Sequence, residues 1–205
     1  MKVLLINGSP HASGNTALAL AQLEDVFAQE DIKVEVIHVG NQAVRGCTAC
    51  YACAKTGKCV FDDIVNKIAP KFRRASGLVV ASPVYYASPN STLTAVLDRL
   101  FFSTRFDKTM KVGAAITVGR RGGLSTAFDQ LNKYFMISGM PIATGQYWNC
   151  AHGQKPGEIL QDEEGLQIMR TLAHNMAFLM KAVALGKEAY GIPEREDFIA
   201  TNFVR

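Results

Sequence analysis

The feature that most constrains the fold is the alternation of short apolar segments with longer amphipathic ones. The short segments predict strands over residues 2–6, 33–39, 77–81, 111–118 and, less regularly, 141–148. Apolar residues at helical spacing predict helices over residues 15–29, 62–74, 91–102, 123–138 and 162–186. Mostly apolar strands that alternate with helices predict an α/β fold, in which a parallel sheet is covered by helices on both faces.

This architecture indicates where a ligand would bind. Right-handed crossovers bring the loops after the strands to one edge of the sheet, and open sheets of this kind bind ligands there. The loops after the first, third and fourth strands are therefore the candidate site. We find no internal repeat and no Pro/Ser-rich linker, so we expect one domain over residues 1–205. The methionine-rich face of the last helix is interpreted as core or subunit packing.

Composition and charge exclude several classes of protein. Lys and Arg number 22 against 18 Asp and Glu, and the net charge of +4 is scattered without a basic run, which argues against a nucleic-acid partner. No apolar run approaches the ~18 residues needed to span a bilayer, so no membrane partner is expected. The N-terminus turns polar at Asn7 without a signal-peptide cleavage pattern, and a cytoplasmic location is predicted.

The loop after the first predicted strand, GSPHASGNT at residues 8–16, is typical of an anion site. Glycines allow backbone amides to turn toward an anion, and the helix that starts near Asn15 adds a partial positive charge. The loop matches neither the Walker A motif nor G-x-G-x-x-G. We predict a phosphate cradle; the alternative is a plain helix cap by Ser13 or Asn15. His11 is interpreted as solvent-facing, with contact to the bound ligand as the alternative.

Two further loops are expected at the same edge. The sequence SPVYYASPNS at residues 82–91 offers adjacent tyrosines for a planar ring, or for packing on a neighbouring segment. The sequence GRRGG at residues 119–123 offers close backbone approach, and Arg120 or Arg121 for a phosphate or an acidic substrate. The alternative for this second loop is a solvated turn.

Four of the five cysteines lie close together, as Cys47-x2-Cys50-x2-Cys53-x5-Cys59. The C-x2-C-x2-C start is that of the bacterial ferredoxin motif, whereas structural zinc more often uses two distant C-x2-C pairs. An ordered loop with free thiols remains the alternative to a metal site. Cys150 lies apart and is interpreted as an unpaired thiol.

The chain resembles the flavodoxin-like NAD(P)H-dependent FMN reductases, including the iron–sulfur flavoprotein branch. The stretches that match are KVLLINGSPHASGNT, GCTACYACAKTGKCVFDD and ASPVYYASPNSTLTAVLDR, within roughly the first 140 residues. The resemblance implies a flavodoxin-like, three-layer, doubly wound five-stranded parallel sheet of order 2-1-3-4-5. It also implies one FMN-binding domain with a Cys-rich loop at residues 46–60 and a C-terminal extension from about residue 187.

The resemblance also implies roles for individual residues. The phosphate of a non-covalent FMN would be held by Ser9, Ser13, Gly14, Asn15 and Thr16. The isoalloxazine ring would be lined by Pro83, Val84, Tyr85 and Tyr86, with Ser88 nearby and with Gly119 and Gly122 at its pyrimidine edge. A 4Fe-4S cluster would be ligated by Cys47, Cys50, Cys53 and Cys59. No catalytic side chain is assigned.

The function implied is that of an FMN-dependent oxidoreductase, which passes electrons from NAD(P)H as co-substrate to a quinone, a flavin or another small acceptor. The alternative is an FMN and 4Fe-4S electron-transfer protein that accepts electrons from ferredoxin. A zinc-bearing interaction module without flavin is a third, less favoured interpretation. The resemblance further implies a homodimer or homotetramer. NADH and NADPH remain equal alternatives.

Overall fold

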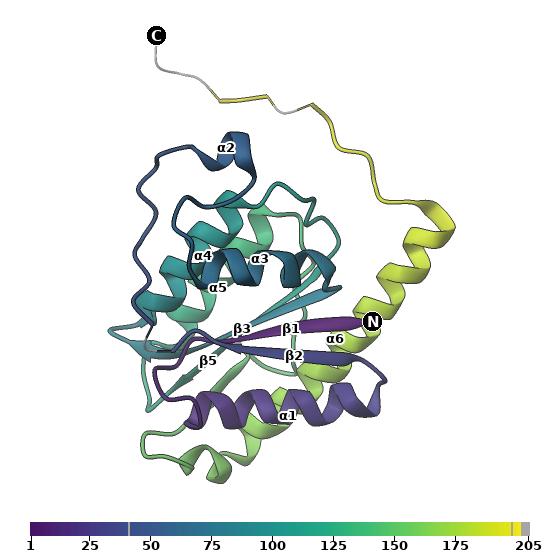
Figure 1. Ribbon diagram of the computed structural model, residues 1–205. Helices are drawn as coiled ribbons and strands as arrows, with labels where there is room; N and C mark the ends of the chain where they lie inside the picture. Colours follow the sequence, from purple (N-terminus) through teal and green to yellow (C-terminus); the bar gives the residue numbers. More distant parts are fainter. Residues whose placement is uncertain (41, 198, 202–205) are drawn as a thin grey trace.

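The computed structural model describes residues 1–40, 42–197 and 199–201. The chain folds into three layers, a central sheet with helices on each of its two faces (Figure 1). Its parallel strands are β1 (Lys2–Asn7), β2 (Lys33–His38), β3 (Gly77–Tyr85), β5 (Val112–Gly119) and β6 (Cys150–His152). They lie in the order β2-β1-β3-β5-β6, and a two-residue strand, β4 (Ser88–Pro89), pairs antiparallel with the end of β3. The parallel strands therefore follow the predicted 2-1-3-4-5 order, and the flavodoxin-like fold is confirmed.

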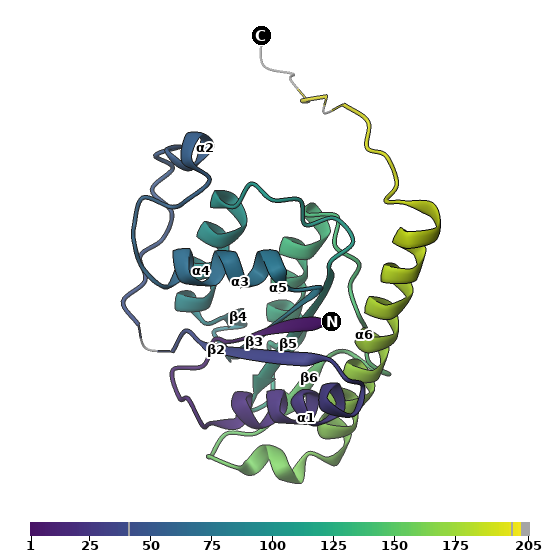
Figure 2. The same ribbon diagram turned by 45° about the vertical axis from the view of Figure 1, so that its right-hand side comes forward.

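Helices cover both faces of this sheet. The helical elements are α1 (Asn15–Gln29), α2 (Cys53–Thr56), α3 (Ile64–Arg74), α4 (Ser91–Ser103), α5 (Leu124–Ile137), the 3-10 helix η1 (Glu158–Gln161) and α6 (Glu163–Tyr190). Helices α1 and α6 pack on one face of the sheet, and α3, α4 and α5 pack on the other (Figure 2). Within the described ranges, no helix has the length and apolar character needed to cross a membrane.

The strands are apolar throughout because both of their faces are buried. In β1, Val3 and Leu5 belong to the core beneath α1 and α6, whereas Leu4 and Ile6 belong to the core beneath α3, α4 and α5. Successive side chains of a strand point to opposite faces, so a strand between two helical layers has no polar face. The methionines of α6 lie in the first of these cores, as predicted.

Side-chain caps fix where several helices begin. The Asp63 carboxylate accepts a hydrogen bond from the Val65 amide at the start of α3, at 3.0 Å. The Asn90 side chain accepts from the amides of Thr92 and Leu93 at the start of α4, at 2.8 and 3.3 Å. These caps satisfy amides that have no partner within the helix. Asp63 and Asn90 therefore fix the residues at which α3 and α4 begin.

The structure corrects the position of the fifth strand. Residues 141–148 form only an isolated bridge between Ile142 and Gly113, and the strand lies later, at Cys150–His152. The Asn149 side chain explains the shift, because it accepts from the Gly145 amide at 3.0 Å and donates to the Ala115 carbonyl at 3.1 Å. The chain therefore turns before it enters the sheet.

Several other elements also differ from the prediction. Strand β3 continues past residue 81 to Tyr85, so the first tyrosine of the predicted loop is in fact in a strand. The last helix continues to Tyr190 instead of ending at residue 186. Helix α2, strand β4 and η1 were not predicted, because each is only two to four residues long. The remaining boundaries agree with the prediction to within two residues.

Candidate functional site

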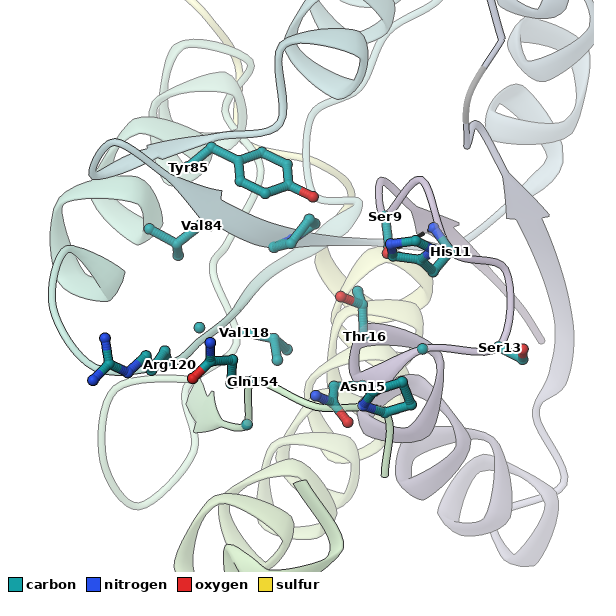
Figure 3. A pocket seen from close by; sticks show the side chains of 15 residues that line it. Ser9, His11, Ser13, Asn15, Thr16, Val84, Tyr85, Val118, Arg120 and Gln154 are labelled. Carbon is teal, nitrogen blue, oxygen red and sulfur yellow. Dashed lines mark hydrogen bonds between the residues drawn. The ribbon is translucent and has the colours of Figure 1, made fainter. Parts of the chain in front are cut away.

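A cavity of about 460 Å³ opens at the carboxyl edge of the sheet, where the loops after β1, β3 and β5 meet. The sequence placed three loops here, and the structure adds a fourth segment, residues 153–156 after β6. Figure 3 shows Ser9, His11 and Thr16 on one side of the cavity and Val84 and Arg120 on the other. The cavity therefore joins a hydroxyl-rich end to a more apolar end.

The loop after β1 is shaped by its own polar side chains. The Asn7 side chain accepts a hydrogen bond from the Ser9 amide at 2.9 Å, and the Ser9 hydroxyl accepts one from the His11 amide at 3.1 Å. The Gly8 amide donates to the Ala81 carbonyl of β3 at 2.8 Å. A Cβ on Gly8 would lie 2.7 Å from the Leu93 side chain, so only glycine fits here. The loop is held rigidly against the sheet.

Helix α1 points its amino end into the cavity. It begins after Gly14, which has no side chain to cap the first amides, and the side chains of Ser13 and Thr16 line the same region. The first amides of a helix have no carbonyl partner within that helix, and its dipole places partial positive charge there. Backbone amides and hydroxyls at this end are suited to an anion such as a phosphate.

Asn15 connects this loop to the fourth segment of the site. Its side-chain amide donates to the Lys155 carbonyl at 2.9 Å, and its side-chain oxygen accepts from the Gly157 amide at 2.9 Å. A Cβ on Gly153 would lie 2.9 Å from the Asn15 side chain. Both polar ends of Asn15 thus hold backbone, so the residue positions residues 153–157 beside the cavity.

The segment after β6 was missed because the fifth strand was predicted too early. Gly153, Gln154 and Pro156 line the cavity, and the Glu158 carboxylate accepts from the amides of Lys155 and Gln154. These backbone hydrogen bonds, the one from Lys155 first, hold the pKa of Glu158 below its ordinary value. A strand ending at residue 152 would have put the sequence GQKP in the expected place for a ligand-binding loop.

The apolar end of the cavity is formed by the end of β3. Pro83, Val84 and Tyr85 line it, and the chain then turns back through Tyr86 and Ala87 into β4. Both turn residues have positive φ, 50° and 59°, which is the backbone conformation of a tight hairpin turn. A Cβ on Gly123 would lie 2.7 Å from Ala87, so the loop after β5 packs closely on this hairpin.

The cavity lining leaves out some of the predicted residues. Among the described residues, those that line it include Ser9, Ser13, Gly14, Asn15, Thr16, Pro83, Val84, Tyr85 and Gly119, but not Tyr86, Ser88 or Gly122. Tyr86 is fully exposed at the hairpin tip, and Ser88 pairs with Tyr85 in the hairpin. Gly122 lines a separate cavity of about 350 Å³.

The two arginines after β5, Arg120 and Arg121, line different cavities. Arg120 lines the main cavity, and Arg121 lines the second one together with Tyr147 and Trp148. Arg120 is therefore the arginine of this pair that could meet an anionic ligand in the main cavity. His11, interpreted from the sequence as solvent-facing, is exposed and also lines the main cavity.

The main cavity suits a mononucleotide with a planar ring. Its volume falls in the range of roughly 300–1,000 Å³ typical of small-molecule sites. The amino end of α1, with the hydroxyls of Ser13 and Thr16, offers donors to a phosphate, and Pro83 to Tyr85 offer apolar and aromatic surface to a ring. These residues fit FMN as the sequence predicts.

The four clustered cysteines line one small cavity of about 20 Å³ with aromatic neighbours such as Phe61 and Phe102. Cys53 is buried, Cys59 is half-buried, and Cys47 and Cys50 are exposed. The described part of the chain holds no group of three or more His, Cys, Asp or Glu side chains already arranged for a metal ion. Four thiolates are a donor set that an iron–sulfur cluster can use, and the cluster predicted on these cysteines stays a prediction.

Cys150 is separate from that group, as expected. It starts β6, and its sulfur lies 3.2 Å from the Thr117 hydroxyl. Burial raises the pKa of the Cys150 thiol above its ordinary value. At neutral pH this cysteine is therefore a protonated, weakly reactive thiol.

Comparison with protein families and with curated proteins gives consistent results. A family model described as NADPH-dependent FMN reductase matches residues 1–155. An iron-sulfur flavoprotein of Methanocaldococcus jannaschii is 32% identical over 191 residues, which cover 89% of this chain and 99% of that protein. An iron-sulfur flavoprotein of Methanosarcina thermophila is 29% identical over 92% of this chain and 100% of its own length.

Solved structures show the same fold at low sequence identity. RosB, crystallised with a bound riboflavin-phosphate intermediate, superposes with a TM-score of 0.71 at 16% identity, over 99% of this chain and 92% of that one. A flavodoxin from the domain Archaea superposes with a TM-score of 0.56 at 16% identity, over 86% of this chain and 99% of that one. At such identities the likeness concerns the fold alone.

Proposed function

Because the chain belongs to the NADPH-dependent FMN reductase family, we propose that it binds FMN non-covalently in the main cavity and passes electrons from NAD(P)H to a small acceptor, such as a quinone or a flavin. The observation that carries the proposal is that one cavity joins the amino end of α1 to the aromatic end of β3. The iron-sulfur flavoprotein relatives support a flavin-dependent redox role.

The phosphate end would be held mainly by backbone. The amides at the start of α1 and the hydroxyls of Ser9, Ser13 and Thr16 would donate to the phosphate oxygens. Gly14 allows the close approach of the backbone, and Asn15 holds the neighbouring segment in place. Arg120 lies on the other side of the cavity (Figure 3), so the phosphate would be neutralised at its own end by backbone and hydroxyl dipoles.

The ring end would be formed by Pro83, Val84 and Tyr85, with Gly119 beneath. A Cβ on Gly119 would lie 3.4 Å from Val84, which is an ordinary van der Waals contact, so Gly119 packs directly against the wall at this end. We place Tyr86, Ser88 and Gly122 around this end as outer residues, since they sit in the hairpin and in the loop that packs on it.

When bound, FMN supplies the redox chemistry by accepting a hydride from NAD(P)H and releasing two electrons to the acceptor. The protein's part is to bind and orient the ring, to leave one side open to the nicotinamide, and to offer backbone donors. Hydride transfer to the flavin needs no general acid or base from a side chain, and no catalytic side chain is assigned.

A flavin titration tests the proposal. The purified chain should quench FMN fluorescence with one site per chain, and the complex should oxidise NADH or NADPH in the presence of a quinone. A comparison of the two nucleotides determines the preferred one. A chain without flavin bands that also takes up no FMN would overturn the proposal.

The clustered cysteines favour a second candidate function. We infer that the chain could carry a 4Fe-4S cluster on Cys47, Cys50, Cys53 and Cys59 and relay electrons from ferredoxin to FMN. The specific support is that all four side chains line one cavity and that the relatives are named iron-sulfur flavoproteins. Such a cluster would supply one electron at a time.

Two measurements separate the candidates. Anaerobic reconstitution followed by iron and sulfide analysis decides whether a cluster forms, and zinc in place of iron would point to a structural metal. Steady-state NAD(P)H oxidation with a quinone then discriminates the roles. Fast turnover favours the reductase, and slow turnover with rapid reduction by ferredoxin favours the relay.

We propose a homodimer or homotetramer as the assembled form. Phe178 and Leu185 lie seven residues apart on one face of α6, and they are 70% and 67% exposed. Exposed apolar groups on one face are typical of a subunit contact. Sedimentation velocity measures the state directly, and a monomer at micromolar concentration would contradict it. The expected cytoplasmic location stays a prediction.

A further inference from the structure

The largest fully buried side chain in the described structure is an arginine, Arg99 of α4, and it lies beneath the cysteine-rich segment. Its side chain is 1% exposed. A buried charge is costly unless every donor is satisfied and a counter-charge is present. The partners of Arg99 therefore indicate what the residue does.

All five N–H groups of this guanidinium find acceptors. Nη1 donates to Asp63 at 2.6 Å and to the Arg45 carbonyl at 3.2 Å, and Nη2 donates to Asp63 at 3.0 Å and to the Phe61 carbonyl at 3.2 Å. The remaining donor, Nε, points at the Cys59 sulfur at 3.2 Å. Arg99 thus fastens the chain on both sides of residues 46–60.

Cys59 is held by hydrogen bonds at both its backbone and its sulfur. Its backbone amide donates to the Asn66 side chain at 3.1 Å, and its carbonyl accepts from the same side chain at 3.0 Å. Its sulfur is oriented by Arg99, whereas Cys47 and Cys50 are exposed. One ligand of the set is therefore held in place before any cluster binds.

The positive charge of Arg99 lies nearer to the Cys59 sulfur than the negative charge of Asp63 does. The positive guanidinium lies next to the sulfur, and the Asp63 carboxylate binds the guanidinium through Nη1 and Nη2, away from Nε. Asp63 is also the cap of α3, through the Val65 amide. The pair is nearly neutral as a whole, but its positive end faces the thiol.

We propose that Arg99 is a positioning residue for an iron–sulfur cluster: it presents the Cys59 sulfur as the fixed ligand, and its charge, opposed by Asp63, raises the reduction potential of the cluster. The inference rests on the second candidate function above. Reduction by one electron adds one negative charge to the cluster and its thiolate ligands. An N–H donor and a positive charge at a ligand sulfur stabilise that added charge.

Two substitutions should move the potential in opposite directions. Arg99→Gln removes the positive charge next to the sulfur and should lower the potential. Asp63→Asn removes the opposing negative charge, keeps a side chain that caps α3, and should raise the potential. Both variants break a buried ion pair and both should lose thermal stability. A purely structural role would not give opposite signs.

The measurement is a redox titration of the full chain after anaerobic reconstitution with iron and sulfide, with dithionite as the one-electron donor. Electron paramagnetic resonance of the reduced cluster reports its potential. Arg105→Gln is the matched control, because Arg105 donates to the Ala54 carbonyl of the same segment from an exposed position. Its potential should equal that of the unmodified chain.

The outcomes separate the inference from its premise. If the unmodified chain takes up no iron and sulfide, the cluster proposal fails and the role of Arg99 fails with it. If the cluster forms but Arg99→Gln and Asp63→Asn both match Arg105→Gln, or shift the same way, only the inference is overturned. Should Arg99→Gln fail to fold, an unchanged or lowered potential in Asp63→Asn also overturns it. FMN affinity should be the same in all variants.

Discussion

At the scale of single residues, Asn15 shows how the site is held together. The sequence suggests a phosphate ligand or a helix cap, but its side chain bonds the backbone of Lys155 and Gly157, 140 and 142 residues away. Its neighbours Ser13 and Thr16 line the cavity as hydroxyl donors. One amide therefore joins two walls of the cavity, and its contribution to ligand binding is indirect.

Asn15→Ala should weaken FMN binding on the order of tenfold. Two hydrogen bonds, each worth about 1 kcal/mol, would be lost, and residues 153–157 would no longer be held at the cavity. Fluorescence titration with FMN measures the change. Asn175→Ala is the control, because Asn175 lies on α6, donates to the Thr144 carbonyl, and does not belong to the cavity lining of the described chain. An unchanged dissociation constant would contradict the role of Asn15.

At the scale of elements, the close approach of α5 to β5 depends on a glycine. A Cβ on Gly113 would lie 2.5 Å from the ring of Phe135, a buried residue of α5. Gly186 of α6 is the opposite case, since nothing in the described structure lies within 4 Å of its added Cβ. In the sequence, Gly113 and Gly186 look alike, because each lies inside a predicted strand or helix. The packing around them in the structure shows that only Gly113 is tightly enclosed.

Gly113→Ala should destabilise the protein by about 1–3 kcal/mol, because the ring or the helix must shift to accommodate a methyl group. Gly186→Ala should instead stabilise it by up to about 1 kcal/mol, since alanine is the better helix former. Urea denaturation followed by circular dichroism gives both values. Equal effects in the two variants would show that packing at Gly113 is not tight.

An ion-pair cluster connects β1, β2 and α3. The Glu35 carboxylate accepts hydrogen bonds from Lys2 and Lys71, and these, the one from Lys2 first, hold its pKa below the ordinary value of 4.5. A carboxyl with a lowered pKa in the folded state stabilises the fold above its unfolded pKa. That contribution is lost as the pH falls through the folded pKa, which lies below 4.5.

Glu35→Gln should therefore reduce the free energy of unfolding by up to about 1 kcal/mol at pH 7, a magnitude typical of partly exposed pairs. The difference from the unmodified chain should shrink as the pH is lowered below 4.5. Urea denaturation at several pH values measures it. Glu188→Gln, which removes the same charge from the exposed end of α6, controls for net charge. A gap that stays constant down to pH 3 would be the contrary result.

At the scale of the whole molecule, the main cavity is assembled from distant parts of the chain. Its walls come from the loop after β1, the end of β3, the loop after β5 and residues 153–156 (Figure 3). The cysteine-rich segment with α2 lies outside the layer of α3 and α4 (Figure 1). Ligand binding at the cavity should therefore stabilise the fold as a unit.

FMN at a hundredfold excess over its dissociation constant should add about 2.7 kcal/mol to the stability. For a chain of 205 residues this corresponds to a rise in Tm of roughly 5–10 °C. Differential scanning calorimetry with and without FMN measures the shift. Riboflavin, which lacks the phosphate, should give a much smaller rise; an equal rise would argue against the phosphate end of the site.

The sequence alone determined the layered fold and three of the four walls of the cavity, because hydrophobic periodicity and glycine-rich turns are local patterns. The strand order was implied by the resemblance to the flavodoxin-like reductases and not by the periodicity. It also determined the spacing of Cys47, Cys50, Cys53 and Cys59. The tertiary structure decided where the fifth strand lies, that residues 153–156 close the site, and that Arg99 lies under Cys59. Each of these three features is set by hydrogen bonds between side chains and groups that can be far apart in the sequence. Hydrophobic periodicity is a local pattern, so it does not predict such long-range partners.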